Sequence, residues 1–433
     1  MEHRAPLAEL IRLAVPSALF TVLTNSYRIV DQYFVQRISV DAQAAIGSSI
    51  YVLIAFYAVF ELVAGGAAPL VARATGANDP ASRRQHFGAA TFGAFMISGV
   101  LMVLGAVGAP WIVSSLGLEG QAAVECERYL FTVSITILPL VFTPLVDQVF
   151  LAMGYAKGPL LLHALTLALN LVLTPYLIES HGIVGAALAS TASRFVATAI
   201  GYVALVRIIG LRLGDVRPAG LRRVTRIGLP ITLNTLLYAG VYWMLLKTSV
   251  SPLGPSVNAA LGIGFSALEG FTWPVFHGVS LGAASLVGRQ LGARDKEAAR
   301  RTVRLAFPIT TALGVAASLA FYFAGEPLTG FFTDDPVVHA AAIEYATILA
   351  FTQTCVAWEA LAEGVLAGAG DTKTVFWWSA PFNIVRVPMA WALALPLGFG
   401  AAGIWWAINV TSAAKAFGKG WATYRGRWLD LEP

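Results

Sequence analysis

Long apolar stretches alternate with short polar connections along almost the entire chain. Each stretch continues for about 20 residues or more, which is long enough for a helix to cross the ~30 Å hydrocarbon core of a membrane. None shows the alternation of apolar and polar residues that a membrane-spanning strand requires. The pattern predicts an all-α membrane protein with twelve transmembrane helices, near residues 10–34, 44–72, 87–109, 127–152, 158–178, 182–207, 226–250, 257–288, 304–324, 338–367, 373–396 and 400–422.

The second half of the chain repeats the first. Arg73 returns as Arg289, and the apolar stretches around these residues follow in the same order. Because each half holds an even number of spans, both halves enter the membrane from the same side, and the repeats are parallel. We therefore predict two six-helix lobes, residues 1–206 and 227–433, related by a pseudo-twofold axis around a central cavity and joined by a basic cytoplasmic linker at 207–226.

Composition and charge agree with this interpretation. Hydrophobic residues make up 57% of the chain and charged residues 12%, whereas soluble domains carry roughly 25% charged residues. Most of the 29 Lys and Arg residues lie in the tails and in the connections after the even-numbered spans. Basic residues concentrate on the cytoplasmic side, so we expect the protein in a bacterial plasma membrane with both termini in the cytoplasm. This distribution explains the net charge of +5 without a nucleic-acid partner.

Signals for a cofactor or for enzymatic chemistry are missing from the sequence. The two cysteines, Cys126 and Cys355, lie far apart and have no metal-binding spacing around them, so we expect neither a metal centre nor a disulfide framework. There is no His-xxxx-Asp acyl-transfer signature and no serine nucleophile elbow. An integral-membrane enzyme is therefore disfavoured, and no cofactor is expected.

Short motifs in a fixed order carry a resemblance to a known family. They are Leu13–Pro16 and Ile227–Pro230 at the starts of spans 1 and 7, Val30–Ile38 late in span 1, Gly370–Lys373 before span 11, and Arg386–Pro388 within it. Over essentially the whole chain, the sequence resembles the multidrug and toxic compound extrusion (MATE) family. The resemblance implies two six-helix lobes around a central cavity, and outward export of organic, usually cationic, compounds against an inward H⁺ or Na⁺ gradient.

Asp31 is the first candidate for cation coupling. It matches the span-1 aspartate that the family resemblance implicates in that role. A carboxylate in a poorly hydrated cavity can also bind and release a proton, or neutralise a cationic substrate, so that proton and substrate compete for one charge. The alternative is a static ion pair with Arg28, three residues earlier on the same helix.

Lys247 suggests a lock between the two lobes. The repeat places Asp31 of span 1 opposite Leu246, next to Lys247 of span 7. An ion pair between Asp31 and Lys247 would close the outer mouth of the cavity until protonation of Asp31 weakens it, which is a contact that differs between two states. The alternative is that Lys247 extends to the membrane interface.

Neither ion site known in the family is complete in this chain. Asn170 in span 5 matches the family's asparagine, but Thr174 stands where one branch of the family has a second aspartate. The stretch Tyr238–Tyr242 in span 7 lacks the glutamate of the sodium-coupled branch. The resemblance therefore leaves open whether H⁺ or Na⁺ is the coupling ion, with H⁺ favoured.

Three further ionisable groups are candidates to complete the coupling site, because such groups are costly to bury in a membrane without a function. Glu61 of span 2 corresponds in the repeat to His277 of span 8, and Glu269 lies two helical turns before His277. A hydrogen-bonded core residue is the alternative for His277. Aromatic side chains attract organic cations, so Tyr27, Tyr242 and Trp273 are expected to line the cavity with Asp31 and Lys247.

The remaining ionisable residues of the spans help to predict the charge of the transported compound. Asp147 and Glu363 lie near the cytoplasmic ends of spans 4 and 10, where capping a helix or pairing with basic loop residues is the expected role. We count six acidic candidates within the spans (Asp31, Glu61, Asp147, Glu269, Glu359 and Glu363) and four basic ones (Arg28, Arg194, Lys247 and Arg386).

The excess of acids in that count favours a transporter of cationic compounds. The main alternative is a lipid-linked saccharide flippase. We therefore predict a secondary active antiporter, expected to be a monomer surrounded by membrane lipids. It exports hydrophobic, mostly cationic organic compounds in exchange for H⁺ or Na⁺ by alternating access.

Overall fold

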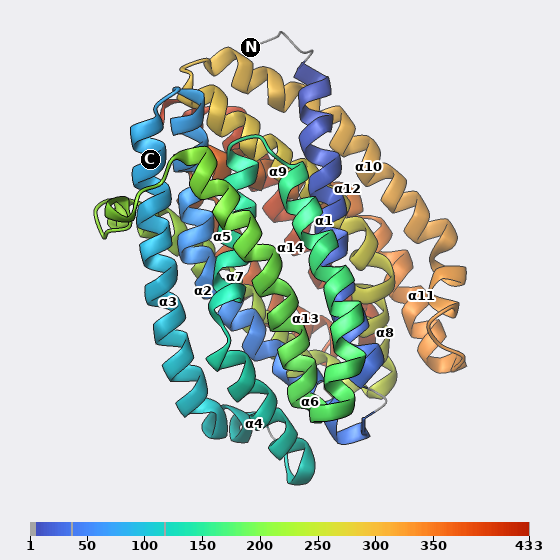
Figure 1. The fold of residues 1–433 in the computed structure, drawn as a ribbon. Helices are drawn as coiled ribbons and strands as arrows, with labels where there is room; N and C mark the ends of the chain where they lie inside the picture. The colour runs from blue at the N-terminus through green and yellow to red at the C-terminus, as the bar shows by residue number, and fades with distance from the viewer. Residues whose placement is uncertain (1–5, 36–37, 117, 433) are drawn as a thin grey trace. The chain divides into compact units, whose positions relative to one another are not determined.

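The computed structural model describes residues 6–35, 38–116 and 118–432, and the side chains of residues 25, 27–32, 40, 43–44, 47, 50–51 and 266–267 lie outside this description. The described chain is helical and contains no strand (Figure 1). The predicted all-α fold is therefore confirmed. By length and composition, six of the described helices can cross a membrane, or eight if each of two bent helix pairs counts as one span.

The helices follow the predicted spans in order. The first half of the chain forms α1 (Pro6–Val35), α2 (Val40–Gly76), α3 (Pro80–Ser115), α4 (Gly120–Ile135), α5 (Leu138–Ala152) and α6 (Lys157–Ile209). The second half forms α7 (Leu221–Leu245), α8 (Pro255–Ile263), α9 (Gly270–Gly292), α10 (Lys296–Gly330), α11 (Pro336–Ala350), α12 (Gln353–Gly368), α13 (Thr372–Ala394) and α14 (Gly400–Arg425). Two π-helical segments, η2 (Leu246–Val250) and η4 (Gly264–Glu269), follow α7 and α8. Short 3₁₀ turns occupy Leu213–Asp215, Ser251–Leu253 and Arg427–Asp430.

Predicted spans 4 and 10 are each bent. α4 and α5 meet at 56°, and α11 and α12 meet at 58°. Pro139 explains the first bend, because its ring clashes with the carbonyl group four residues earlier, at Ile135, where α4 ends. At the second bend, Asn409 Nδ2 donates to the Ile348 carbonyl oxygen at 2.6 Å and so satisfies a group near the break.

Two compact units divide the chain, and their boundary falls inside helices. One unit consists of the chain up to Leu19 together with residues from Leu233 onward, and the other consists of Phe20–Thr232. The lobes 1–206 and 227–433 stay a prediction, and the compact units differ from them in the first part of α1 and of α7. The start of α1 packs with the C-terminal unit, and the start of α7 packs with the N-terminal unit.

Glycines explain this reciprocal packing. A Cβ atom at Gly278 of α9 would lie 2.5 Å from the Ala18 backbone nitrogen of α1. A Cβ atom at Gly228 of α7 would lie 1.9 Å from the Leu62 carbonyl oxygen of α2. Small residues let helices approach this closely in membranes, so each contact depends on glycine.

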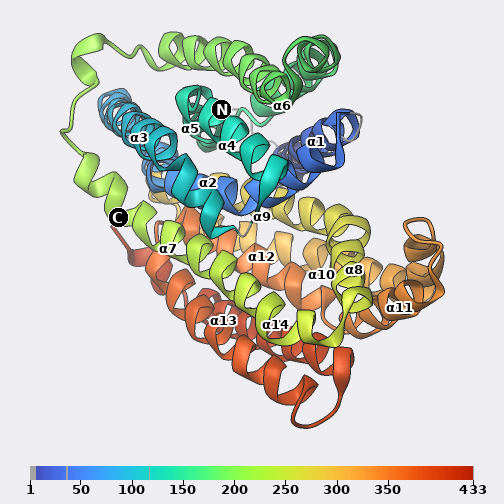
Figure 2. The same ribbon diagram turned by 90° about the horizontal axis from the view of Figure 1, so that it is seen from below.

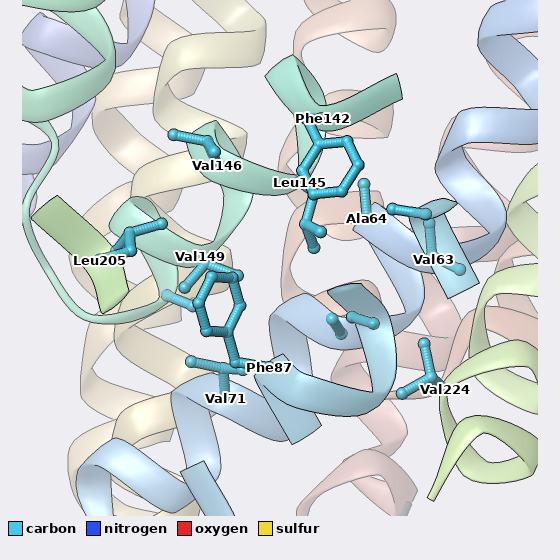
Figure 3. Close-up of a cluster of buried hydrophobic side chains, with 14 of the residues drawn as sticks. Val63, Ala64, Val71, Phe87, Phe142, Leu145, Val146, Val149, Leu205 and Val224 are labelled. Carbon is cyan, nitrogen blue, oxygen red and sulfur yellow. The ribbon is translucent and has the colours of Figure 1, made fainter. Parts of the chain in front are cut away.

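The core of the N-terminal unit includes residues from α7. Val224 is fully buried and belongs to the same apolar cluster as Val63 of α2, Phe87 of α3 and Leu145 of α5 (Figure 3). Close van der Waals packing of such side chains stabilises helix contacts in a membrane. The exchanged start of α7 is thus an integral part of this core.

The repeated glycine pairs near the starts of spans 6 and 12 serve two purposes. Gly182 has a φ of 57° and Gly400 a φ of 58°, a left-handed conformation that disfavours side chains. Gly185 and Gly403 instead pack against the preceding span, and a Cβ atom at Gly185 would lie 1.9 Å from the Leu177 carbonyl oxygen. Only the second glycine of each pair therefore packs closely against the preceding span.

We expect Gly185→Ala to lower the free energy of unfolding by about 1–3 kcal/mol, because overpacking forces the backbone to shift. Gly99→Ala is the matched control, since nothing lies within 4 Å of a Cβ atom at this position of α3. The measurement is thermal unfolding of both purified variants in detergent. Equal stability of the two variants would contradict the close approach at Gly185.

Candidate functional site

A buried polar network lies within the N-terminal unit. Gln148 Nε2 of α5 donates to Glu61 Oε2 of α2 at 2.8 Å, and the Glu61 side chain is only 6% exposed. The neighbouring residue, Asp147, has its Oδ2 atom 2.7 Å from Nε2 of His163 on α6. The other ring nitrogen of His163, Nδ1, lies 3.2 Å from Thr24 Oγ1 of α1. This network therefore connects four helices.

Both ring nitrogens of His163 have polar partners. Nε2 contacts Asp147 Oδ2, and Nδ1 contacts Thr24 Oγ1, which itself donates to the Phe20 carbonyl oxygen at 2.9 Å. Asp147 thus has an imidazole partner on another helix of the same unit.

A small cavity borders the Asp147–His163 pair. Its volume is about 10 Å³, enough for roughly one water molecule. Polar and apolar residues together form its lining: Thr143, Val146, Asp147, Leu162, His163, Thr166, Arg194, Ala197 and Thr198. The cavity can supply one water molecule to the pair.

Asn170 lies deep in the same unit. Its side chain is almost fully buried, and its Nδ2 atom donates to Ser190 Oγ at 3.2 Å, both residues lying on α6. Thr174, one turn further along, is also buried. The position of the family's missing aspartate therefore lies inside this unit.

A cluster of four charged residues joins α12 to α14 in the C-terminal unit, where these two helices lie side by side (Figure 2). Lys419 Nζ lies 2.8 Å from Glu359 Oε1 and 2.6 Å from Glu363 Oε2. Lys415 Nζ lies 3.1 Å from the same Glu359 oxygen. We call these four residues the α12–α14 charge cluster.

Arg386 of α13 is buried beside this cluster. Its guanidinium donates to Thr411 Oγ1 at 2.8 Å and to Ser412 Oγ at 3.0 Å. It also donates to the Tyr242 hydroxyl at 3.2 Å and stacks over that ring. Tyr242, predicted to line the cavity, thus holds a cation of its own chain.

Glu269 differs from the glutamates of the α12–α14 charge cluster. It ends η4, and its Oε1 atom accepts a hydrogen bond from the Tyr345 hydroxyl at 2.8 Å. Among the described residues, no Lys, Arg or His nitrogen lies within 4.0 Å of the carboxylate of Glu269 or of Glu61. Glu61 in the N-terminal unit and Glu269 in the C-terminal unit therefore lie within predicted spans and have neutral hydrogen-bond donors.

The other predicted residues of the C-terminal unit, His277 and Lys247, form no ion pair within 4.0 Å with the α12–α14 charge cluster among the described residues. The His277 ring stacks on Trp273, with centroids 5.7 Å apart. Lys247 is exposed in η2, with its Nζ atom 5.2 Å from the centre of the Trp243 ring. The side chains of Asp31, Tyr27 and Arg28 lie outside the described residues, so the proposed Asp31–Lys247 pair stays a prediction.

Two sequence-based interpretations are wrong. Asp147 and Glu363 neither cap helices nor pair with loop residues, because Asp147 contacts His163 and Glu363 contacts Lys419, both on other helices of their own units. The count of basic residues in the spans also omitted Lys415 and Lys419. Including them removes the excess of acids on which that count rested.

The spacing of these charges held a signal for the missed cluster. Glu359 and Glu363 are four residues apart in one predicted span, and Lys415 and Lys419 are four residues apart in another. Residues at this spacing share one face of a helix. Two opposite charged faces within the membrane would have indicated that the two helices pair.

For metals, the described part of the chain contains no group of three or more His, Cys, Asp or Glu side chains that could hold an ion.

A family model and curated relatives both match most of this chain. A family model described as MatE matches residues 16–176 and again residues 230–392. A probable multidrug resistance protein NorM from Thermotoga maritima is 25% identical over 402 residues, covering 90% of this chain and 84% of that protein. A protein of the same name from Bradyrhizobium diazoefficiens is 27% identical, covering 93% and 90%.

Solved structures share the fold. A multidrug resistance MATE family transporter of the MOP superfamily, in an outward-facing conformation, superposes with a TM-score of 0.89 at 19% identity, covering 99% of this chain and 97% of that one. A MOP superfamily transporter from Pyrococcus furiosus, whose binding pocket is described as having reverse polarity, superposes with a TM-score of 0.90 at 19% identity, covering 99% and 97%.

Proposed function

The chain belongs to the MATE family of membrane transporters, and from this we propose that it is a secondary active antiporter. It exports hydrophobic organic compounds, mostly cations, in exchange for H⁺ or Na⁺. The repeated match of the family model to both halves supports this proposal, as do relatives named multidrug resistance proteins. The protein is an integral membrane protein and not an enzyme.

The two carboxylates with neutral donors carry the proposal. Glu359 and Glu363 are each paired with a lysine, and Asp147 contacts the His163 imidazole, whereas Glu61 and Glu269 have their donors in Gln148 and Tyr345. A buried carboxylate without a cation is costly in a membrane unless it binds a proton or another positive charge. Glu61 and Glu269 are therefore the described groups best suited to hold the coupling ion or a cationic cargo.

Competition for such a carboxylate links the two fluxes. A proton neutralises the carboxylate when it enters from outside, and a cationic compound takes the same charge when it enters from inside. Each ligand drives a conformational change only to the extent that it binds one state more tightly than the other. Antiport follows when the carboxylate holds either the proton or the cargo.

The argument against a lipid-linked saccharide flippase was an excess of acidic residues in the spans. That excess disappears when Lys415 and Lys419 are included. However, Lys415 and Lys419 do not favour the flippase, since both ammonium groups are bound by glutamates of the same unit. We therefore keep organic cations as the proposed cargo. We also retain the plasma membrane, cytoplasmic termini and a monomeric state as parts of the proposal.

Efflux from proteoliposomes tests the proposed function. Purified protein would be reconstituted with a cationic fluorescent dye under an imposed pH or Na⁺ gradient, and wild type would be compared with Asp31→Asn. We expect a pH gradient to drive efflux and Asp31→Asn to abolish it. Efflux driven only by Na⁺ would change the coupling ion, and absence of efflux for every cationic dye would favour the flippase.

A further inference from the structure

The α12–α14 charge cluster has the geometry of an occupied cation site. The Lys419 ammonium lies between the carboxylates of Glu359 and Glu363, and its side chain is 1% exposed. Carboxylate oxygens are also the ligands that hard metal cations bind in proteins. The position between the two glutamates is thus filled by a positive charge that the chain carries itself.

The charge balance in the α12–α14 charge cluster disfavours binding of a metal cation in addition to the two lysines. Glu359 and Glu363 carry two negative charges, and Lys415 and Lys419 carry two positive charges. The next cation is Arg386, on the adjacent helix α13, whose donors are bound by hydroxyl groups. A metal ion added here would leave uncompensated positive charge in a low-dielectric interior, which is strongly unfavourable.

We propose that Lys419, supported by Lys415, is a built-in cation that takes the place of Na⁺ at the Glu359–Glu363 pair. The C-terminal unit therefore binds no coupling Na⁺ at this position. This inference rests on the proposed antiport function and narrows it, because it makes Lys419 a determinant of ion specificity.

The inference predicts that removing the ammonium creates a Na⁺ site. Lys419→Met keeps the length and apolar stem of the side chain but leaves Glu363 without a cation. We expect NaCl at ~100 mM, compared with choline chloride at equal ionic strength, to raise the Tm of Lys419→Met by about 2 °C or more. The Tm of the wild type should be the same in both salts.

The double variant Lys419→Met/Glu363→Gln is the matched control, since it lacks both the ammonium and one carboxylate, and its Tm should not respond to Na⁺. Lys419→Gln provides a second test of the same site if Lys419→Met is not recovered folded. A response of the single variants no larger than that of the wild type would overturn the inference. So would ²²Na⁺ binding by the wild type that is lost in Glu363→Gln. None of these readouts requires transport, so they remain decisive even if dye efflux fails.

Discussion

Glu61→Gln is expected to reduce efflux driven by a pH gradient to the rate of protein-free liposomes. The amide keeps the size of the side chain and can still hydrogen-bond with Gln148, but it cannot take up a proton. Glu61 is 6% exposed and has no cationic partner among the residues that the structure describes. Loss of its charge therefore removes a site at which proton and cargo compete, while the fold is preserved.

Two variants control this experiment. Glu61→Asp retains a titratable carboxylate and should retain part of the proton-driven efflux. Glu179→Gln removes an exposed carboxylate of α6, just before the kink at Gly182, and its efflux should equal that of the wild type. Unchanged efflux in Glu61→Gln would exclude Glu61 from coupling and leave Asp31 and Glu269 as candidates.

Glu359→Gln is expected to be the most destabilising of the substitutions considered, with a loss of about 3–5 kcal/mol in the free energy of unfolding. Both lysines of α14 contact the same Glu359 oxygen, so the amide leaves Lys415 without a carboxylate and Lys419 with Glu363 alone. An uncompensated buried ammonium is costly because its hydration is lost.

Glu363→Gln is the matched comparison for this prediction. The Glu363 side chain is 39% exposed, and Lys419 keeps Glu359 when Glu363 is neutralised. Its cost should therefore be clearly smaller. Unfolding of both variants in detergent measures the difference, and equal losses would contradict the shared role of Glu359.

The sequence was sufficient to predict the helices, because apolar length decides whether a segment can cross a membrane. It also predicted Glu61 and Glu269 as candidates, because a charge within a span is visible without knowledge of packing. Lys415 and Lys419 were missed because basic residues near the end of a span resemble interfacial anchors. Their role depends on α14 packing against α12, which lies about 50 residues earlier and presents two glutamates on the facing side.

His163 shows the same limit for the N-terminal unit. Its partner Asp147 lies in the preceding span, and the network reaches α1 through Thr24. The polar linker at 207–226 marks the division between the predicted lobes, whereas the compact units divide elsewhere. Packing moves the change of unit into the apolar interiors of α1 and α7.

The exchanged starts of α1 and α7 bear on how such a duplicated chain arose. In a single half made alone, the start of the first helix would lack the helix against which it packs, and that half would also offer such a helix to the first helix of a second copy. Two copies would then associate by trading these segments, in the manner of a domain-swapped dimer. Fusion of two such copies into one polypeptide would keep these helix starts exchanged. The two halves of the sequence would then be joined by the exchanged segments as well as by the linker.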